Sequence, residues 1–209
     1  NYIALLGWSP KSNTGKMTLR ALEEDFSLSG LNKSPAIFDE AKLRWLSGEY
    51  LKEMSGEEFA ALATPFLEKS KAYGKYDTEK LLGIVKTRVD ILSEIPSKLD
   101  FLEEYGKIDP ALYFNKKMKS DAQIAKTVLP AAAQTLAGVE KFENAELYAA
   151  LVALAGDLGM KNGQVLWCVR IALTARENTP GGASEMAELL GKERCLARLS
   201  QAEGWLKEE

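Results

Sequence analysis

Two arginines lie among apolar residues of predicted helices, where a guanidinium group can act as a fixed hydrogen-bond donor. Arg88 has Val85 and Leu92 as helix neighbours, and Arg170 stands in the otherwise apolar run of residues 167–174. Arg88 is either a surface residue whose stem lies along the protein, or a positioned donor. Arg170 belongs either to an ordinary helix end or to a binding site formed with the loop that follows.

That loop, residues 178–182, is rich in proline and glycine and contains Thr179. An arginine at the mouth of such a loop is suited to reading an unstacked RNA base. Two parallel N–H groups match the O2 and N3 acceptors of cytosine, whereas uracil offers a donor at N3 that leaves an arginine hydrogen unpaired. The Thr179 hydroxyl can donate to uracil or accept from it. Arg170 and Thr179 are therefore candidates for base recognition.

A second candidate for RNA contact is the helix that Asp39 is predicted to cap. Phe38 and Trp45 are seven residues apart, so we expect them to share one face, and an amphipathic helix would bury Phe38 in the core. Lys42 and Arg44 are expected to point away from that face. Phosphate contacts by Lys42 would fix the register of an RNA without reading its sequence.

The loops that commonly bind phosphate are absent or incomplete. Neither GxxxxGK[ST] nor GxGxxG occurs in the chain. Residues 117–120, Lys-Met-Lys-Ser, resemble the lysine loop of class I aminoacyl-tRNA synthetases, in which a mobile lysine stabilises a phosphate transition state. They lack the central serine of that loop, so the structural interpretation is a solvated helix start.

Residue types exclude several classes of catalytic site. The 209 residues contain no histidine, which excludes Ser-His-Asp and Cys-His catalysis, His-ligated zinc and an imidazole base. Cys168 and Cys195 form no CxxC pattern, so a Cys₄ zinc site is also excluded. We predict no catalytic residue, no metal site and no cofactor in this chain, and two buried thiols in a reducing compartment.

Composition is that of an ordinary globular protein, with 46% hydrophobic and 27% charged residues. The net charge of −3 gives no overall attraction to nucleic acid, so any RNA contact must come from local basic patches. No apolar run approaches the ~20 residues of a membrane helix. Because the chain starts without Met or a basic flank, we expect a piece of a longer protein and no signal peptide.

Apolar residues recur with helical spacing almost throughout, and no alternating run indicates a strand, so we predict an all-α fold. Ser55 and Glu58 form a capping-box pattern, and Pro130 is expected to kink its helix. The expected helices are residues 57–67, 78–93, 120–136, 144–158, 163–174 and 183–207, the last broken near Gly191. Breaks between them suggest three segments, residues 1–54, 55–102 and 103–209.

Four segments, in order and at about the expected spacing, resemble bacterial glutamyl-tRNA synthetases, which are class I enzymes. They are Asn1-Tyr-Ile-Ala-Leu-Leu-Gly-Trp-Ser-Pro10, Ser34-Pro-Ala-Ile-Phe-Asp-x-x-Lys-Leu-x-Trp45, Arg170-Ile-Ala-Leu-Thr174 and Leu189-Leu-Gly-Lys-Glu-Arg194. The resemblance implies that residues 1–54 are the C-terminal part of the stem-contact domain. It also implies that residues 55–102 and 103–209 are two subdomains of an all-helical anticodon-binding region.

The resemblance further implies a role for each candidate residue. Arg88 would read the third anticodon base, a cytosine in glutamate tRNAs, and Arg170 and Thr179 would contact the first and middle bases. Lys42 and Trp45 would contact the tRNA stem. The catalytic domain, with ATP and Mg, would lie upstream, so this chain would itself be inactive. Its partner would be tRNA(Glu), bound by a cytoplasmic monomer with no DNA or membrane partner.

The chain departs from the family at two positions, and other interpretations remain open. Ser47 stands where the family often has Asn, and Ala175 where it often has Gly. An alternative is a non-enzymatic all-helical protein-interaction module, which would leave Arg88 and Arg170 far apart or in internal salt bridges. A small-molecule enzyme is disfavoured, because the chain lacks histidine, a metal-binding motif and a cofactor-binding loop.

Overall fold

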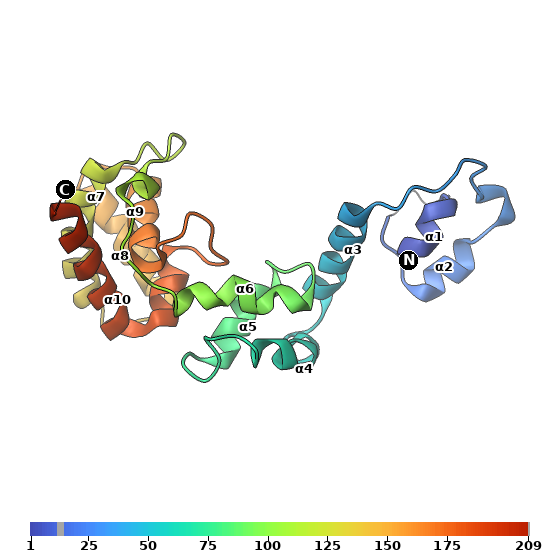
Figure 1. Cartoon of the computed structure of the whole chain (residues 1–209), viewed down its shortest axis with the longest axis horizontal. Coiled ribbons are helices and arrows are strands. Elements are labelled where there is room, and N and C mark those ends of the chain that lie inside the picture. Colours follow the sequence, from blue (N-terminus) through green and yellow to red (C-terminus); the bar gives the residue numbers. More distant parts are fainter. Residues whose placement is uncertain (12–14, 209) are drawn as a thin grey trace.

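The computed structural model describes residues 1–11 and 15–208, and within them the chain is helical with no strand. Figure 1 shows an elongated molecule, with the N-terminal helices at one end and the C-terminal bundle at the other. The helices are α1 (Tyr2–Gly7), α2 (Leu19–Asp25), α3 (Glu40–Glu53), α4 (Gly56–Leu67), α5 (Thr78–Lys86), α6 (Ile95–Leu99), α7 (Ala122–Ala137), α8 (Asn144–Asp157), α9 (Asn162–Thr174) and α10 (Ala183–Lys207). The all-α prediction is confirmed.

The C-terminal bundle is formed by α7–α10. The α10 helix packs against α7, α8 and α9, and α9 also contacts α7 and α8. Sequence signals set the helix ends: the Asp121 carboxylate accepts from Ile124 N at 2.8 Å to start α7, and Gly191, with φ 75°, breaks α10 as predicted. The α7 helix continues past Pro130.

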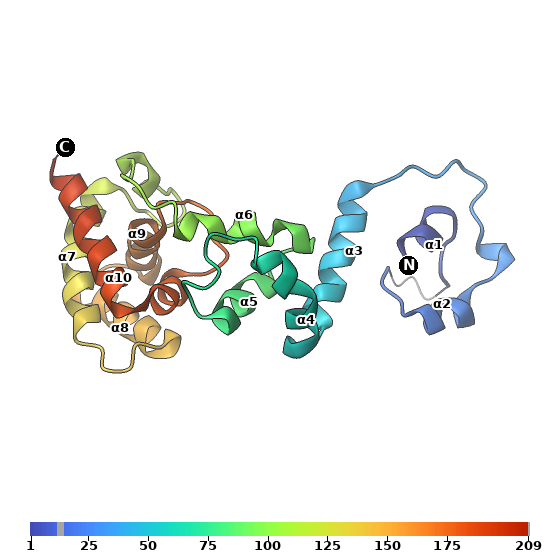
Figure 2. The ribbon, with the colours of Figure 1, turned by 60° about the horizontal axis from the view of Figure 1, so that its bottom comes forward.

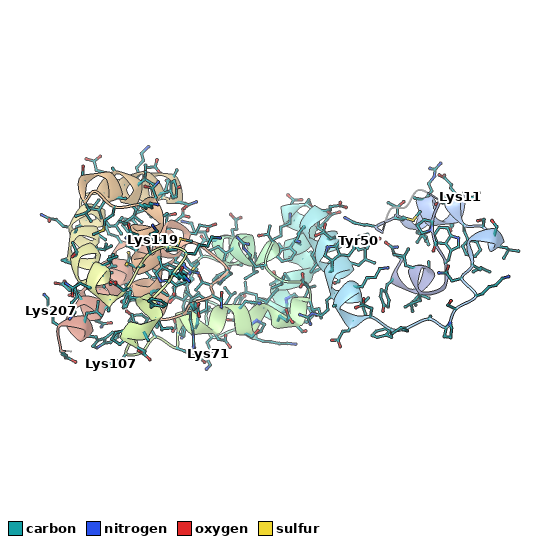
Figure 3. All side chains as sticks on the ribbon, turned by 90° about the horizontal axis from the view of Figure 1, so that it is seen from above. Lys11, Tyr50, Lys71, Lys107, Lys119 and Lys207 are labelled. Atoms are coloured by element: carbon teal, nitrogen blue, oxygen red, sulfur yellow. The ribbon has the colours of Figure 1, made fainter. Side chains whose placement is uncertain are left out.

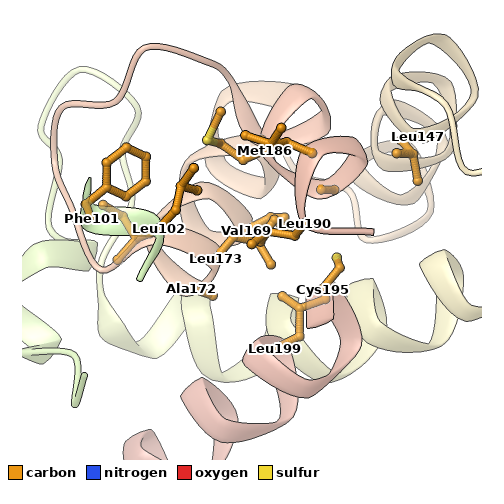
Figure 4. Packing of buried hydrophobic residues seen from close by; sticks show 14 of the residues in the cluster. Phe101, Leu102, Leu147, Val169, Ala172, Leu173, Met186, Leu190, Cys195 and Leu199 are labelled. Carbon is orange, nitrogen blue, oxygen red and sulfur yellow. The ribbon is translucent and has the colours of Figure 1, made fainter. Parts of the chain in front are cut away.

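A middle layer of α4, α5 and α6 joins this bundle through a continuous apolar core. The Ser55 and Glu58 side chains make both hydrogen bonds of the predicted capping box at the start of α4. Buried Leu102 belongs to the same core as Leu173 of α9, and Figure 4 shows both near α10. This core extends from residue 51 to residue 206, so the middle layer and the bundle are packed together.

Among its described residues, the N-terminal part has a separate core made of Trp8, Met17 and Leu22. Hydrogen bonds link it to α3 and the α3 cap: the Tyr2 hydroxyl donates to the Asp39 carbonyl at 2.8 Å, and the Tyr50 hydroxyl lies 2.6 Å from the Met17 carbonyl oxygen. Figure 2 shows α3 between the α1–α2 pair and α4, and Figure 3 labels Tyr50 at this junction.

Two local predictions are wrong. The helix expected over residues 78–93 ends at Lys86, because Thr87, with φ −94° and ψ 3°, leaves the helical conformation; Thr and Val are poor helix formers. Residues 92–94 form a short 3₁₀ turn, and α6 begins at Ile95 with Pro96 in its first turn.

The second error concerns the aromatic face of α3. Phe38 precedes the Asp39 cap and is 64% exposed, with its ring edge-on to Tyr2 at 5.4 Å, and Trp45 is 48% exposed. Arg44, expected to point away from the aromatic face, forms an ion pair with Glu94. Among the described residues, neither Phe38 nor Trp45 belongs to a hydrophobic core, so the helical spacing of the two aromatics did not lead to burial.

Candidate nucleic-acid interface

One cleft of about 650 Å³ opens between α8, α9, the first turn of α10 and the loop of residues 175–182. In Figure 1 this loop, in orange, extends from the bundle towards α6. The cleft has the size of a ligand site. Its walls include aromatic, cationic and hydroxyl side chains, among them Arg88, Tyr148, Trp167, Arg170 and Thr179.

Arg170 is held on two sides. It lies on α9, with its guanidinium carbon 4.7 Å from the centre of the Trp167 ring one turn earlier, and its Nη1 donates to the Thr179 hydroxyl oxygen at 3.1 Å. Trp167 is itself fixed, because its indole N–H donates to the Leu112 carbonyl at 3.3 Å. Burial lowers the pKa of Arg170, and the nearby charge of Glu177 raises it; the group stays protonated at neutral pH.

Arg88 reaches the cleft from the middle layer. It lies just beyond the end of α5, where its backbone N–H donates to the Val85 carbonyl at 2.8 Å. Its Nε donates to the Pro180 carbonyl at 3.1 Å. That bond makes Arg88 a positioned donor.

Thr179 is the loop residue that bonds to Arg170, and it directly precedes Pro180, which bonds to Arg88. Its hydroxyl accepts from Arg170 and donates to the Gly181 carbonyl at 2.7 Å. The loop starts at Ala175, which has a left-handed conformation with φ 52°. Glycine favours a left-handed conformation, which agrees with the glycine that glutamyl-tRNA synthetases often have at the position of Ala175.

A second hollow of about 600 Å³ lies across the same loop. Arg88, Thr179 and Pro180 line both hollows, and Lys98 and Arg176 add cations to the second. Asp100 and Glu104 on its wall offset that charge. Within the described ranges neither Arg88 nor Arg170 forms a salt bridge, and the carboxylate of Glu185, which lines the first cleft, accepts from Gly182 N.

Residues 58–203 match the model of a protein family described as the anticodon binding domain. The chain belongs to this family. Glutamate–tRNA ligases of Clostridium novyi (strain NT) and Clostridium tetani (strain Massachusetts / E88) are 38% and 39% identical to it over its whole length. The chain spans 43% of each, less than half the length of these curated relatives.

Solved structures show the same fold. A crystal structure of a glutamate tRNA ligase from Elizabethkingia meningosepticum CCUG26117, in complex with its amino acid, aligns with a TM-score of 0.77 at 23% identity. The alignment covers 97% of this chain and 40% of that one. The family match and the glutamate–tRNA ligase relatives confirm the resemblance to glutamyl-tRNA synthetases, and the solved structure confirms the fold.

The anticodon-binding match includes three of the five candidate residues. Arg88, Arg170 and Thr179 lie within it and line one cleft, the arrangement that base recognition requires. Lys42 and Trp45 lie outside it on α3 and do not line that cleft. The structure leaves their stem contact as a prediction.

Sequence reasoning missed part of the cleft. Trp167 supports Arg170 from one helical turn away, a spacing at which side chains meet, so the pair could have been recognised. Tyr148, half exposed on α8, lines the opposite part of the cleft without any sequence signal. The Pro180 carbonyl is a backbone group, and only tertiary structure shows its partner.

The remaining lysine motif lies in a turn before α7. Asn115 and Ser120 close it with backbone hydrogen bonds of 2.9 and 3.1 Å, and Lys117 and Lys119 are exposed. Asp121 then caps the helix, which agrees with a solvated helix start. In the ranges that the structure describes, no group of three metal-binding side chains forms, and no helix is long and apolar enough to traverse a bilayer.

Proposed function

We propose that this chain is the tRNA-binding, C-terminal part of a glutamate–tRNA ligase and selects tRNA(Glu) through its anticodon. The single observation that carries the proposal is that Arg88, Arg170 and Thr179, from three parts of the chain, line one cleft. Family membership and the glutamate–tRNA ligase relatives support the choice of ligand. The parent enzyme would join glutamate to its tRNA with ATP and Mg in a domain outside this chain, as a cytoplasmic monomer.

The chemistry of the cleft fits unstacked pyrimidines. Each arginine keeps terminal N–H donors free after its bond to the loop, because a guanidinium carries five. Two such donors match cytosine and leave one unpaired opposite uracil. The half-exposed Tyr148 ring adds a flat surface on which a base can stack, whereas the buried Trp167 ring supports Arg170. We assign Arg88 to the third anticodon base, and Arg170 with Thr179 to the first and middle bases.

The three segments of the chain would take different parts in tRNA binding. Residues 1–54 would belong to the stem-contact domain, where Lys42 and Trp45 are both exposed on α3. Residues 55–102 would carry Arg88, and residues 103–209 would carry Arg170 and Thr179. Anticodon reading would then use two subdomains that share one core.

Filter binding to tRNA(Glu) and to transcripts with a changed third anticodon base tests the role of Arg88. Arg88→Ala should reduce the preference for cytosine there by about 1–3 kcal/mol, roughly 5- to 150-fold, because a bidentate contact is lost. Arg194→Ala is the matched control: Arg194 covers Tyr76 at 4.9 Å and does not line the cleft. Unchanged preference in Arg88→Ala would refute the assignment.

Arg170→Ala should relax selection at the first and middle bases while the fold is retained. A circular dichroism melt of the same variant separates the two roles, since a large fall in Tm with unchanged base preference would make Arg170 purely structural.

The affinity of the chain for tRNA(Glu) should also fall steeply with salt concentration despite the net charge of −3, because phosphate contacts release counterions. A flat salt response would contradict RNA binding.

A further inference from the structure

The two base-reading arginines are bonded to consecutive residues of one loop. The Nε of Arg88 donates to the carbonyl of Pro180, and Nη1 of Arg170 donates to the hydroxyl of Thr179, both at 3.1 Å. Arg88 belongs to the middle layer and Arg170 to the bundle. The peptide link between Thr179 and Pro180 is therefore a short covalent connection between two donors on different parts of the molecule.

This connection is stiff. The Thr179 hydroxyl donates to the Gly181 carbonyl at 2.7 Å, and Pro180 is buried with its backbone φ fixed by its ring. A Cβ at Gly181 would lie 2.6 Å from the Met186 side chain, so the backbone sits tightly on α10. At the far end, Gly182 N donates to the Glu185 carboxylate at 2.7 Å, which anchors the loop to the first turn of α10. A displacement of Pro180 must move Thr179 with it.

We propose that the Thr179–Pro180 link energetically couples Arg88 to Arg170, so that discrimination at the third anticodon base depends on discrimination at the first two. This inference rests on the proposed function. A base that shifts the Arg88 guanidinium pulls the Pro180 carbonyl, and through Thr179 it alters the aim of Arg170. A wrong base at one position therefore weakens recognition at the others, although the two arginines form no bond with each other.

The coupling has a signature that independent contacts lack. Substitutions at independent sites have effects that multiply in affinity, whereas members of one unit lose less together than the product of their separate losses. We expect the Arg88→Gln and Arg170→Gln pair to lose at least threefold less affinity for tRNA(Glu) than that product. The measurement is a double-mutant cycle by filter binding with the full chain.

A coupling through the RNA itself would give the same cycle, so the loop must be changed. Two glycines inserted between Thr179 and Pro180 lengthen the link and leave both contact residues, Thr179 and Pro180, in the chain. In that background the coupling factor should fall to one. Thr179→Val, which removes only the hydroxyl, is a second route to the same result. A coupling factor that persists in both backgrounds, or that is one with the natural loop, overturns the inference.

A measurement without RNA separates this inference from the proposed function. In ¹⁵N spectra of the free protein, Arg170→Gln should shift the Nε–H signal of Arg88, and Arg194→Gln, off the loop, should leave it in place. An unmoved signal in both variants refutes the link even if tRNA selection is lost as proposed. A moved signal with tRNA binding unaffected by either single variant refutes the proposed function and retains the link.

Discussion

The α7–α10 bundle and the described part of residues 1–31 bury their apolar side chains to very different extents. In the bundle Leu129, Leu136 and Leu147 are fully buried in a core shared with the middle layer. In the N-terminal part the core has three members, while Ile3 and Leu19 remain 83% and 74% exposed. The cleft is built on the well-packed region, where side chains can be held within the tolerance that the proposed base reading needs.

The two regions are also held in place by different interactions, apolar packing in the bundle and hydrogen bonds at the N-terminal part. The bundle is held by apolar contact between long helices, whose stability scales with buried area. The N-terminal part is held to α3 by hydrogen bonds, such as the 2.6 Å contact of Tyr50 with the Met17 carbonyl. Each such bond contributes only about 0.5–1.5 kcal/mol net. We therefore expect the two regions to unfold separately.

Leu136→Ala should give the largest effect, a loss of about 2–5 kcal/mol in the free energy of unfolding, because it leaves a cavity in the bundle. Leu22→Ala is the comparison, since Leu22 is nearly as buried but belongs to the small N-terminal cluster. Its main transition in urea, followed by circular dichroism, should stay within about 0.5 kcal/mol of the parent. Equal losses in both variants would show one cooperative unit and break the comparison.

Local rules predicted several helix starts and the break in α10 well and the contacts within the cleft poorly, for a physical reason. Capping by Ser55 and Asp121 and the break at Gly191 are decided within a few residues, so the sequence pattern contains them. The α5 end was missed because weak helix propensity near Thr87 competes with an apolar pattern that continues beyond it.

The contacts of the cleft and the exposure of Phe38 depend on tertiary structure. The family resemblance pointed to Arg88 and Arg170, but their local patterns left each open to a surface interpretation. The bonds to Pro180 and Thr179 depend on how the middle layer packs on the bundle. Burial of Phe38 failed as a prediction because helical spacing states which residues share a face and not whether anything covers it.

Tyr113→Phe should stabilise the protein by about 1 kcal/mol. The Tyr113 hydroxyl is fully buried in the core, and among the described residues it has no hydrogen-bond partner. Burial raises the pKa of Tyr113 well above its usual value, which reflects the same absence of solvation. Removing an unpaired hydroxyl relieves its desolvation cost. A thermal melt that shows a lower Tm would mean that a solvent molecule satisfies the group, and that the bundle is less dry than its packing indicates.

Ala175→Gly should stabilise by about 0.5–1 kcal/mol, the relief of left-handed strain minus the backbone entropy of glycine. Ala197→Gly is the matched control, since Ala197 lies within α10 and the same change there should cost about 1 kcal/mol. Urea denaturation of the two variants should give opposite signs. A loss in Ala175→Gly would mean that the loop of residues 175–182 needs a restricted start, which would extend the stiffness of the bundle into the cleft.

Leu22→Cys is expected to have the smallest effect on global unfolding and to report directly on the separate opening of the N-terminal part. The natural thiols lie in the bundle, where burial raises the pKa of Cys168 to about 11 and that of Cys195 to about 12. Since the thiolate is the reactive form, both should resist a thiol reagent at pH 8. The new thiol, in a small cluster that opens locally, should react much faster.

The same thiols fix the sign of a pH effect that serves as an internal check. In the unfolded chain a cysteine loses its proton near pH 8.5, whereas the folded bundle keeps it until about pH 11. The folded state then binds more protons, so stability contributed by these groups falls as pH rises through that window. Labelling of Cys168 and Cys195 should therefore accelerate with pH in step with global unfolding, while Leu22→Cys follows its own local opening. If all three thiols react at one rate, the N-terminal part and the bundle open together.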